Sequence, residues 1–415
     1  MRKIYSSVDL GSNFVKIVVL ESLNGKLNVL SSVNYPSKGI DKGLITDEKD
    51  VITTIKLAFK EINESLGVKV DKVIISVPID DARYTVTEGY TTITSEEGLI
   101  TSEDILNTLQ ASIYNKIPNN EELVTVLPIK YIIDDKAEVK NPKGLHAKKL
   151  SVKSMMITTN KRDIYKQVGV FSSAGIEVVD ILFNSIGDYY AFKDDNYDKE
   201  AVATINIGGS KTEISIFNRG ILQSSYLLPL GSNIIEQDLS YLYNIDIEKA
   251  SKLKDMFIML DKEYASDNEV YETKDNSNIK IKINQYEASD VASKKIREIL
   301  EKAKKELNLL TKKEIRYIII TGGITNIPGF SSVAREVFGD TAITKELDVI
   351  GIRNNAYSSS YGMIKYFIEK LKLRGREYTM FNEDKEYKLV EERKNNEGFS
   401  FGKFFEYFFN NNKED

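Results

Sequence analysis

The chain lacks several residue types on which whole classes of protein chemistry depend. It has no cysteine among 415 residues, which excludes disulfide bonds and thiolate metal sites. Its single histidine, His146, excludes a metal site built from several imidazoles, and it lies in a polar stretch typical of the protein surface. The formal net charge of −5 argues against nucleic acid as a partner, because such proteins usually carry a strongly basic surface.

Long hydrophobic runs are also missing. No apolar stretch approaches the roughly 20 residues that a membrane-spanning helix needs. The first five residues run directly into a predicted strand, which leaves no room for a signal peptide. We therefore expect a protein of the cytoplasm, or of a membrane surface reached from the cytoplasm.

Two segments, at residues 8–20 and 205–217, share one pattern. Each has an apolar run, then Asp or Asn, then glycine and small polar residues, then an alternating apolar strand. This pattern predicts a β-hairpin whose turn can bring backbone N–H groups close to a phosphate. Two such hairpins in one chain predict a duplicated fold that holds one nucleotide between its halves.

The first hairpin offers a set of phosphate and metal contacts. Asp9 ends a strand, and its carboxylate can hold a magnesium ion, usually through water. Gly11 and Ser12 permit close approach of a phosphate chain, and Asn13 tolerates unusual backbone angles. Lys16 can reach a β- or γ-phosphate. Taken alone, these residues favour a plain tight hairpin, because short Asp-x-Gly-Ser matches are common.

Two further elements strengthen the nucleotide interpretation. The second hairpin repeats the small turn with donors nearby, at Gly208, Gly209, Ser210, Lys211 and Thr212. A third element, Gly322 and Gly323, follows a buried strand, where two glycines let a flat adenosine lie against the backbone. A strand-to-helix turn is the alternative for this third element. The order and spacing of all three predict ATP binding.

The rest of the chain has a clear organisation. Residues 1–81 and 157–200 have an α/β pattern, and residues 82–156 form an α+β insertion that opens with an alternating segment, 83–94, rich in Thr and Tyr. A second α/β section begins at residue 201, with a polar, acidic stretch at 261–283. Residues 374–398 are charged, with few apolar side chains, which is typical of a linker without a core.

The end of the chain carries a stripe of aromatic residues. Phe401, Phe404, Phe405 and Phe408 are spaced i, i+3, i+4 and i+7, and Phe409 extends the stripe. This spacing predicts an amphipathic helix over 399–410 that inserts at a lipid interface. Docking onto the protein's own body or into a partner's groove remains open.

The order of these elements resembles the actin, Hsp70 and hexokinase superfamily, and the details resemble the bacterial cell-division FtsA family. The resemblance covers nearly the whole chain and includes the segments 38–45, 228–233 and 351–357. It implies an α/β, actin-like (ribonuclease H-like) duplicated fold with an inserted α+β subdomain and a C-terminal amphipathic helix. The implied divisions are a first half (1–81 and 157–200), an inserted subdomain (82–156), a second half (201–233 and 310–373), an outer subdomain (234–309), a linker (374–398) and a membrane-targeting helix (399–410).

The resemblance also implies roles for individual residues. Gly322, Gly323 and Ile324 would border the adenosine, and Lys254 would pack by the adenine or ribose. Asn206 stands where the family usually has the Asp that begins the second loop, and Asn184 stands where a Gln commonly orients the attacking water. Asp9 alone would then carry the magnesium shell, so Asn184 and Asp9 are the candidate catalytic groups of a slow ATPase at best.

The function implied is that of a scaffold. FtsA-like proteins bind ATP, polymerise, and hold the division protein FtsZ at the inner face of the cytoplasmic membrane, at the division septum, where other division proteins join. Contacts with the FtsZ C-terminal tail are expected within 234–309. The alternatives are a pilus-assembly scaffold of the same fold and a small-molecule kinase of the superfamily, which would need a catalytic base near the cleft.

Overall fold

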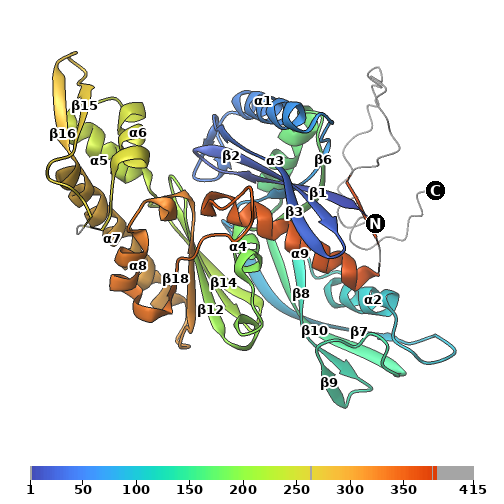
Figure 1. Ribbon diagram of the computed structural model, residues 1–415. Helices are drawn as coiled ribbons and strands as arrows, with labels where there is room; N and C mark the ends of the chain where they lie inside the picture. Colours follow the sequence, from blue (N-terminus) through green and yellow to red (C-terminus); the bar gives the residue numbers. More distant parts are fainter. Residues whose placement is uncertain (1, 262–263, 376, 381–415) are drawn as a thin grey trace.

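The computed structural model describes residues 2–261, 264–375 and 377–380. Three hydrophobic clusters within this range correspond to a first half, an inserted subdomain and a second half. Figure 1 shows the two halves side by side, with the inserted subdomain below the first half. No helix in these ranges is both long enough and apolar enough to cross a bilayer.

The first half is built on a five-stranded mixed sheet. The strand order is β11-β6-β1-β2-β3, with β1 antiparallel to β2 and parallel to β6. The strands are β1 (Lys3–Leu10), β2 (Phe14–Leu23), β3 (Lys26–Pro36), β6 (Lys72–Ser76) and β11 (Glu177–Leu182), and a small ribbon of β4 (Ile40–Asp41) and β5 (Leu44–Ile45) follows β3. The predicted hairpin at the N-terminus is confirmed.

Helices α1 (Glu48–Leu66) and α3 (Lys161–Ser173) belong to this half. The Asp47 carboxylate accepts hydrogen bonds from the backbone N–H groups of Lys49 and Asp50, so it caps α1 as its position predicts. The apolar side chains of α1 are buried at helical spacing. Figure 1 shows α1 on one face of the sheet and the C-terminal helix α9 (Ser358–Arg374) on the other.

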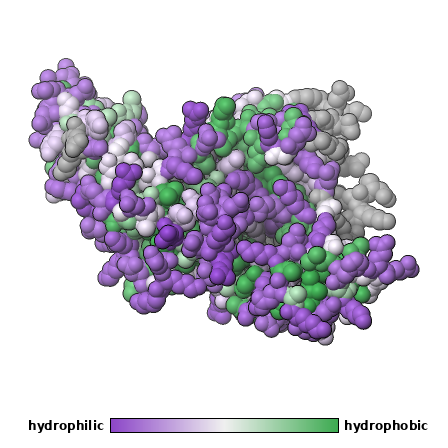
Figure 2. Space-filling model, turned by 60° about the horizontal axis from the view of Figure 1, so that its bottom comes forward, coloured by the Kyte–Doolittle hydropathy of each residue, from purple (hydrophilic) through white to green (hydrophobic). Residues whose placement is uncertain are grey.

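The inserted subdomain is a four-stranded sheet covered by one helix. Its order is β7-β10-β8-β9, with β7 (Arg83–Thr92), β8 (Glu121–Ile133), β9 (Ala137–Val139) and β10 (Lys149–Asn160). Helix α2 (Ser102–Ile113) is capped by Thr101 rather than by Ser102, because Thr101 and Asp104 form a reciprocal capping box. Figure 2 shows a largely hydrophilic surface with apolar side chains gathered over this subdomain, where Val86 of β7 is exposed.

The second half repeats the arrangement of the first. Its sheet has the order β14-β13-β12-β17-β18, with β12 antiparallel to β13 and parallel to β17. The strands are β12 (Ala201–Ile207), β13 (Thr212–Asn218), β14 (Ile221–Leu228), β17 (Tyr317–Thr321) and β18 (Ala342–Ile343). Around them lie α5 (Asn233–Tyr243), α6 (Ile247–Phe257), α7 (Gln285–Leu310), α8 (Phe330–Phe338) and the ribbon of β15 (Val270–Lys274) and β16 (Lys280–Asn284).

Two helices join the halves. Helix α4 (Asn184–Phe192) packs along α9, and the two backbones meet at Gly187 and Gly362. A Cβ on Gly362 would lie only 1.7 Å from the carbonyl oxygen of Gly187, so the close crossing requires glycine. The buried side chains of α9 join the hydrophobic cluster of the first half, although the resemblance places this helix with the second.

The last described segment returns to the first strand. The backbone N–H of Met380 donates to the carbonyl of Ile4 at 2.9 Å, and the N–H of Ile4 donates to the Thr379 hydroxyl at 3.0 Å. Residues 377–380 therefore lie against the folded body, and a linker beginning at 374 is placed several residues too early. The predicted helix 399–410, with its phenylalanine stripe, lies outside the described residues.

Candidate functional site

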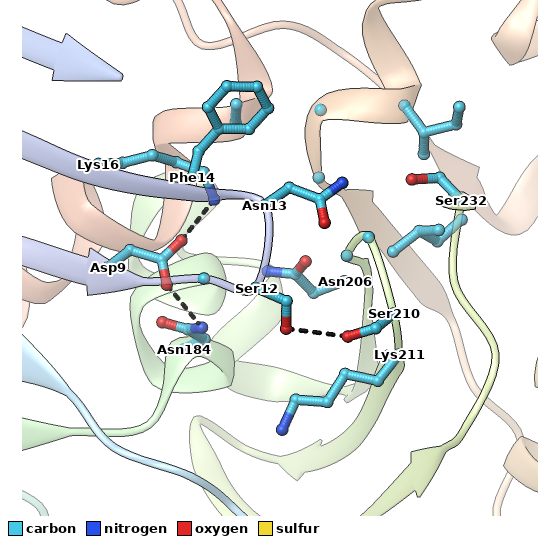
Figure 3. Close-up of a pocket in the computed structure, with 18 of the residues that line it drawn as sticks. Asp9, Ser12, Asn13, Phe14, Lys16, Asn184, Asn206, Ser210, Lys211 and Ser232 are labelled. Carbon is cyan, nitrogen blue, oxygen red and sulfur yellow. Dashed lines mark hydrogen bonds and ion pairs between the residues drawn. The ribbon is translucent and has the colours of Figure 1, made fainter. Parts of the chain in front are cut away.

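A cavity of about 420 Å³ lies between the two halves, at the ends of β1 and β12. This volume is within the usual range for small-molecule sites. The cavity is lined by nearly all the residues that the sequence singled out: Asp9, Gly11, Ser12, Asn13, Lys16, Asn184, Asn206, Gly208, Gly209, Ser210, Lys211, Lys254, Gly322, Gly323 and Ile324. Figure 3 shows labelled side chains from both halves around the cavity, among them Asp9, Ser12 and Lys16 of the first half and Asn206, Ser210 and Lys211 of the second.

The two hairpin turns have the same geometry. In the first, the N–H of Gly11 donates to the carbonyl of Phe14 at 3.1 Å. In the second, the N–H of Gly208 donates to the carbonyl of Lys211 at 2.9 Å. The similarity between the two sequence segments therefore corresponds to a repeated turn, and the two copies face one cavity.

Asp9 is held in place by three polar partners. Its buried carboxylate is 2.6 Å from the Lys16 Nζ and accepts hydrogen bonds from Asn184 Nδ2 at 3.1 Å and from the Ser76 hydroxyl at 3.3 Å (Figure 3). The partners come from β2, α4 and β6, so the position of this carboxylate is fixed by three elements. A carboxylate oriented in this way suits a water-bound magnesium ion.

Asn184 has an unused acceptor. Its Nδ2 donates to Asp9, whereas its Oδ1 is buried and has no hydrogen-bond partner within the described part of the chain. A buried amide oxygen without a partner is costly and is usually satisfied by water or a ligand. This free acceptor is therefore what we expect in a site that binds a polar ligand.

The two turns touch each other across the mouth of the cavity. The Ser210 hydroxyl donates to Ser12 Oγ at 2.9 Å, and Asn13 and Asn233 exchange two side-chain hydrogen bonds, of 2.7 and 3.1 Å. A Cβ on Gly209 would lie 2.4 Å from Asn13 Oδ1, so a larger residue there would displace the Asn13 side chain. The halves are thus in direct contact at the residues expected to hold phosphates.

The lysines beside the two turns, Lys16 and Lys211, already have anionic partners. Lys16 pairs with Asp9, and Lys211 Nζ lies 3.3 Å from Asp80 Oδ2. Both side chains line the cavity, so both can reach a bound anion.

Thr212 does not belong to the cavity lining. It is buried on the opposite face of β13, and its hydroxyl donates to the carbonyl of Leu230 at 2.7 Å. The prediction that it supplies a donor to the phosphates is therefore wrong in this structure. The physical reason is the alternation of side chains along a strand, which turns Glu213 toward the cavity instead.

Glu213 is a site residue that the sequence reasoning missed. It is buried, and it accepts a hydrogen bond from the backbone N–H of Ser185 at 3.1 Å. Burial raises the pKa of its carboxyl to about 7. The available signal is that Glu213 is the single charged residue of strand β13, whose first six residues are buried.

The opposite wall of the cavity holds a buried ion pair. Lys254 of α6 lies 2.5 Å from Glu236 of α5, and both side chains are buried. Glu236 was not singled out, because nothing in the sequence of α5 marks it. Nearby, Gly322 has a φ of 103°, and a Cβ there would lie 2.2 Å from the carbonyl of Ile207, so this wall also needs glycine.

Asn206, the last residue but one of β12, lines the cavity and contacts α4. Its Nδ2 donates to Asp188 Oδ2 at 2.7 Å and to the Ser359 hydroxyl at 3.1 Å. Asp188 is completely buried, and burial raises its pKa to about 6. The polar network at the base of the cavity therefore links β12 with both crossing helices.

Two family models match separate parts of the chain. The model described as "Cell division protein FtsA" matches residues 203–362, and "SHS2 domain inserted in FTSA" matches residues 81–158. The second range coincides with the inserted subdomain, and together the models span more than half of the chain. The chain belongs to the FtsA family.

Curated relatives support this assignment across almost the full length. FtsA of Bacillus subtilis (strain 168) is 28% identical over 376 residues, covering 90% of this chain and 86% of that protein. FtsA of Escherichia coli (strain K12) is 22% identical, covering 88% of this chain and 90% of that protein. The chain is thus an FtsA-type cell-division protein.

Solved structures show the fold. MreB5 of Spiroplasma citri bound to ADP matches with a TM-score of 0.55 at 14% identity, covering 89% of this chain and 97% of that one. A PilM-PilN type IV pilus biogenesis complex matches with a TM-score of 0.57 at 11% identity, covering 87% and 98%. The FtsA-family chain therefore has the actin-like fold, as the order of its motifs implied, with the FtsA-type insertion.

Proposed function

We propose that the cleft between the two hairpin turns binds ATP with magnesium, as a structural or switch ligand. The repeated turn carries the proposal, because two equivalent glycine turns from the two halves face one cavity beside two lysines. Structures of the same fold from Spiroplasma citri hold ADP and AMPPNP, in agreement with this assignment. The unpartnered Asn184 Oδ1 and the oriented Asp9 carboxylate are also consistent with bound magnesium–ATP.

The roles of the lining residues follow from their chemistry. The turn backbones, with Lys16 and Lys211, would bind the phosphates, and Asp9 would hold magnesium through water. Gly322, Gly323 and Ile324 would border the adenosine near Lys254. Bound magnesium–ATP would supply a polyanion that both halves can contact at once. The two turns, with ATP between them, would then stabilise one arrangement of the two halves.

Slow turnover is part of the proposal. Asn184 is the group placed to orient a water, yet its amide N–H₂ is engaged by Asp9. Asn206 offers no carboxylate at the end of the second strand. Asn184 and Asp9 thus remain the candidate catalytic groups of an ATPase that is slow at best.

At the level of the cell, we propose an FtsA-type scaffold that polymerises and tethers FtsZ to the cytoplasmic membrane at the septum. Family membership supports this role. The FtsZ C-terminal tail is expected to bind within 234–309, which holds α5, α6, α7 and the β15–β16 ribbon. The stripe of Phe401, Phe404, Phe405, Phe408 and Phe409 is proposed as the membrane contact. Other division proteins would join the filament.

Nucleotide binding is tested by titrating the protein with a fluorescent ATP analogue and by pelleting it with and without ATP. Saturable binding and ATP-dependent pelleting are expected. Phosphate release comparable to that of dedicated ATPases would contradict the proposed slow turnover, and an absence of binding would overturn the ATP assignment itself.

Membrane binding is tested by co-sedimentation with anionic liposomes. The full-length protein should pellet with the vesicles, whereas a chain ending at Met380, which keeps the contacts to β1, should remain in solution. Phe405→Asp should lose lipid binding and keep nucleotide binding. Equal sedimentation of all three proteins would refute the membrane role.

Partner choice is tested by a pull-down with an FtsZ C-terminal peptide. Retention by the protein supports the division role. Failure to retain it would favour the pilus-assembly alternative, which shares the fold.

A further inference from the structure

The hydrogen bonds around Asn206 allow one orientation of its amide. The Ser358 and Ser359 hydroxyls donate to Asp188 Oδ1 at 2.6 and 2.9 Å. The ionised carboxylate of Asp188 can only accept, so the amide group that faces its Oδ2 at 2.7 Å must be the N–H₂. Because the Ser359 hydrogen is given to Asp188, its oxygen accepts the second amide hydrogen at 3.1 Å.

This assignment leaves the Asn206 carbonyl oxygen for the cavity. Both amide hydrogens are used behind the site, and Asn206 lines the cavity with Asp9 (Figure 3). An amide turned the other way would offer donors to phosphate oxygens and would set its own oxygen against a carboxylate. The side chain therefore presents an acceptor to the cleft, which suits a hydrated cation and not an anion.

Asp188 is the residue that imposes this orientation. It is fully buried on α4, and its hydrogen-bond partners in the described chain, Asn206, Ser358 and Ser359, are all neutral. They come from β12 and α9, so the carboxylate joins the second half to both crossing helices. A buried carboxylate with neutral partners is expensive, and such groups in proteins usually have a role beyond stability.

We propose that Asp188 is a positioning residue that holds the Asn206 amide oxygen toward the cleft, as an acceptor for the water shell of nucleotide-bound magnesium. This inference rests on the proposed function. Asp9 and Asn206 are the last residues but one of equivalent strands in the two halves, so each half would offer one oxygen acceptor. The negative charge missing at position 206 is present behind it, at Asp188.

The placement of the carboxylate at position 188 and the amide at position 206 has an electrostatic reason. An aspartate at 206 would bring two carboxylates into contact in a buried site, where like charges strongly disfavour each other. Asparagine avoids this repulsion and still provides an oxygen. The two residues thus form a unit, and position 206 should tolerate the family's usual Asp only when Asp188 is changed as well.

The test measures the dissociation constant of a fluorescent ATP analogue in excess EDTA and again with magnesium. The first value divided by the second is the ratio compared below, and a large ratio means that magnesium strengthens binding. In Asp188→Asn the amide of Asn206 is free to turn, so the ratio should fall about tenfold, the effect of one charge-assisted hydrogen bond. Asn206→Ala, which removes the acceptor and leaves Asp188 in place, should lower the ratio similarly. The double exchange Asp188→Asn with Asn206→Asp should restore it, because the amide introduced at position 188 could then orient a carboxylate at 206.

Asp180→Asn is the matched control. It makes the same change at another buried carboxylate of the first half, which pairs with Lys370 at 2.7 Å and does not line the cavity. It should lower the melting temperature and leave the ratio unchanged. A purely structural role for Asp188 would shift its melting temperature without moving the ratio.

The outcomes separate this inference from the proposed function. Wild-type protein that binds no nucleotide under either condition would overturn both. Binding with an unchanged ratio in folded Asp188→Asn or in Asn206→Ala would overturn only the positioning role. A double exchange that stays as weak as Asp188→Asn would also overturn it.

Discussion

Glu213 lies opposite Asn206 in the register of β12 and β13. The equivalent positions in the first half hold Lys16 and Asp9, which form an ion pair at the cavity. The duplicated hairpins therefore carry a carboxylate on different strands, β1 in the first copy and β13 in the second. The cleft is asymmetric in charge although its backbone is repeated.

We expect Glu213→Gln to stabilise the protein at alkaline pH. Burial raises the folded-state pKa of Glu213 from an ordinary 4.5 to about 7. Between these values the folded state binds more protons than the unfolded state, so the contribution of Glu213 to the free energy of unfolding falls as pH rises through this window. Gln cannot ionise, so the variant loses this pH dependence. At pH 8, each unit by which the pKa of Glu213 is raised corresponds to about 1.4 kcal/mol of stability that the wild-type protein lacks.

Thermal unfolding at pH 5 and pH 8 checks this expectation. The gain in melting temperature should be larger at pH 8 than at pH 5. A gain of the same size at both would show that Glu213 titrates normally.

Lys16→Met should weaken ATP binding about tenfold or more, because the ammonium group lies beside the first turn, 3.7 Å from where a Cβ on Gly11 would be. Fluorescence titration measures the loss. Lys60→Met changes an exposed lysine on α1, whose ion-pair partner Glu64 lies 3.8 Å away, and it should have no effect. Equal affinities in the two variants would remove Lys16 from the site.

Gly362→Ala should destabilise the protein by several kcal/mol, because the added methyl would overlap the Gly187 backbone where α4 crosses α9. Gly169→Ala in α3 is the control, since a Cβ there meets nothing within 4 Å. That change should stabilise by up to about 1 kcal/mol through helix propensity. Urea unfolding of both variants compares the effects, and a mild loss in Gly362→Ala would mean that the crossing can widen.

A chain ending at Leu373 should be less stable than one ending at Met380. The longer chain keeps a buried Met380 side chain and two hydrogen bonds to the backbone of Ile4. Removing them exposes the start of β1, and we expect a loss of about 2 kcal/mol or more. Melting curves of the two proteins measure it. Identical curves would indicate that residues 374–380 contribute nothing to the fold.

The sequence predicts the hairpins well because their signals are local. A glycine turn between two apolar strands needs no distant partner to be recognised, and both copies show the same turn hydrogen bond. The sequence predicts an insertion at 82–156, and the strands of the inserted sheet run from Arg83 to Asn160. Such a boundary is marked by a local change in composition and in the pattern of apolar residues.

Contacts between distant segments cannot be predicted from local sequence patterns in the same way. Thr212 and Glu213 are neighbours, and which of them faces the cavity depends on where the sheet packs. The contact of Lys254 with Glu236 joins two helices, and that of Asn206 with Asp188 joins a strand to a helix. Neither pair has a characteristic spacing, so no sequence pattern marks them.

The return of the chain to β1 also bears on how the protein folds. Helix α9 fills the core beneath the first sheet, and Met380 binds beside Ile4, more than 370 positions away in sequence. The first half therefore cannot complete its core during synthesis until nearly the whole described chain has left the ribosome. Such long-range closure slows folding and leaves hydrophobic surface exposed meanwhile. We expect the second half, whose cluster is formed by residues 203–338, to become protease-resistant first.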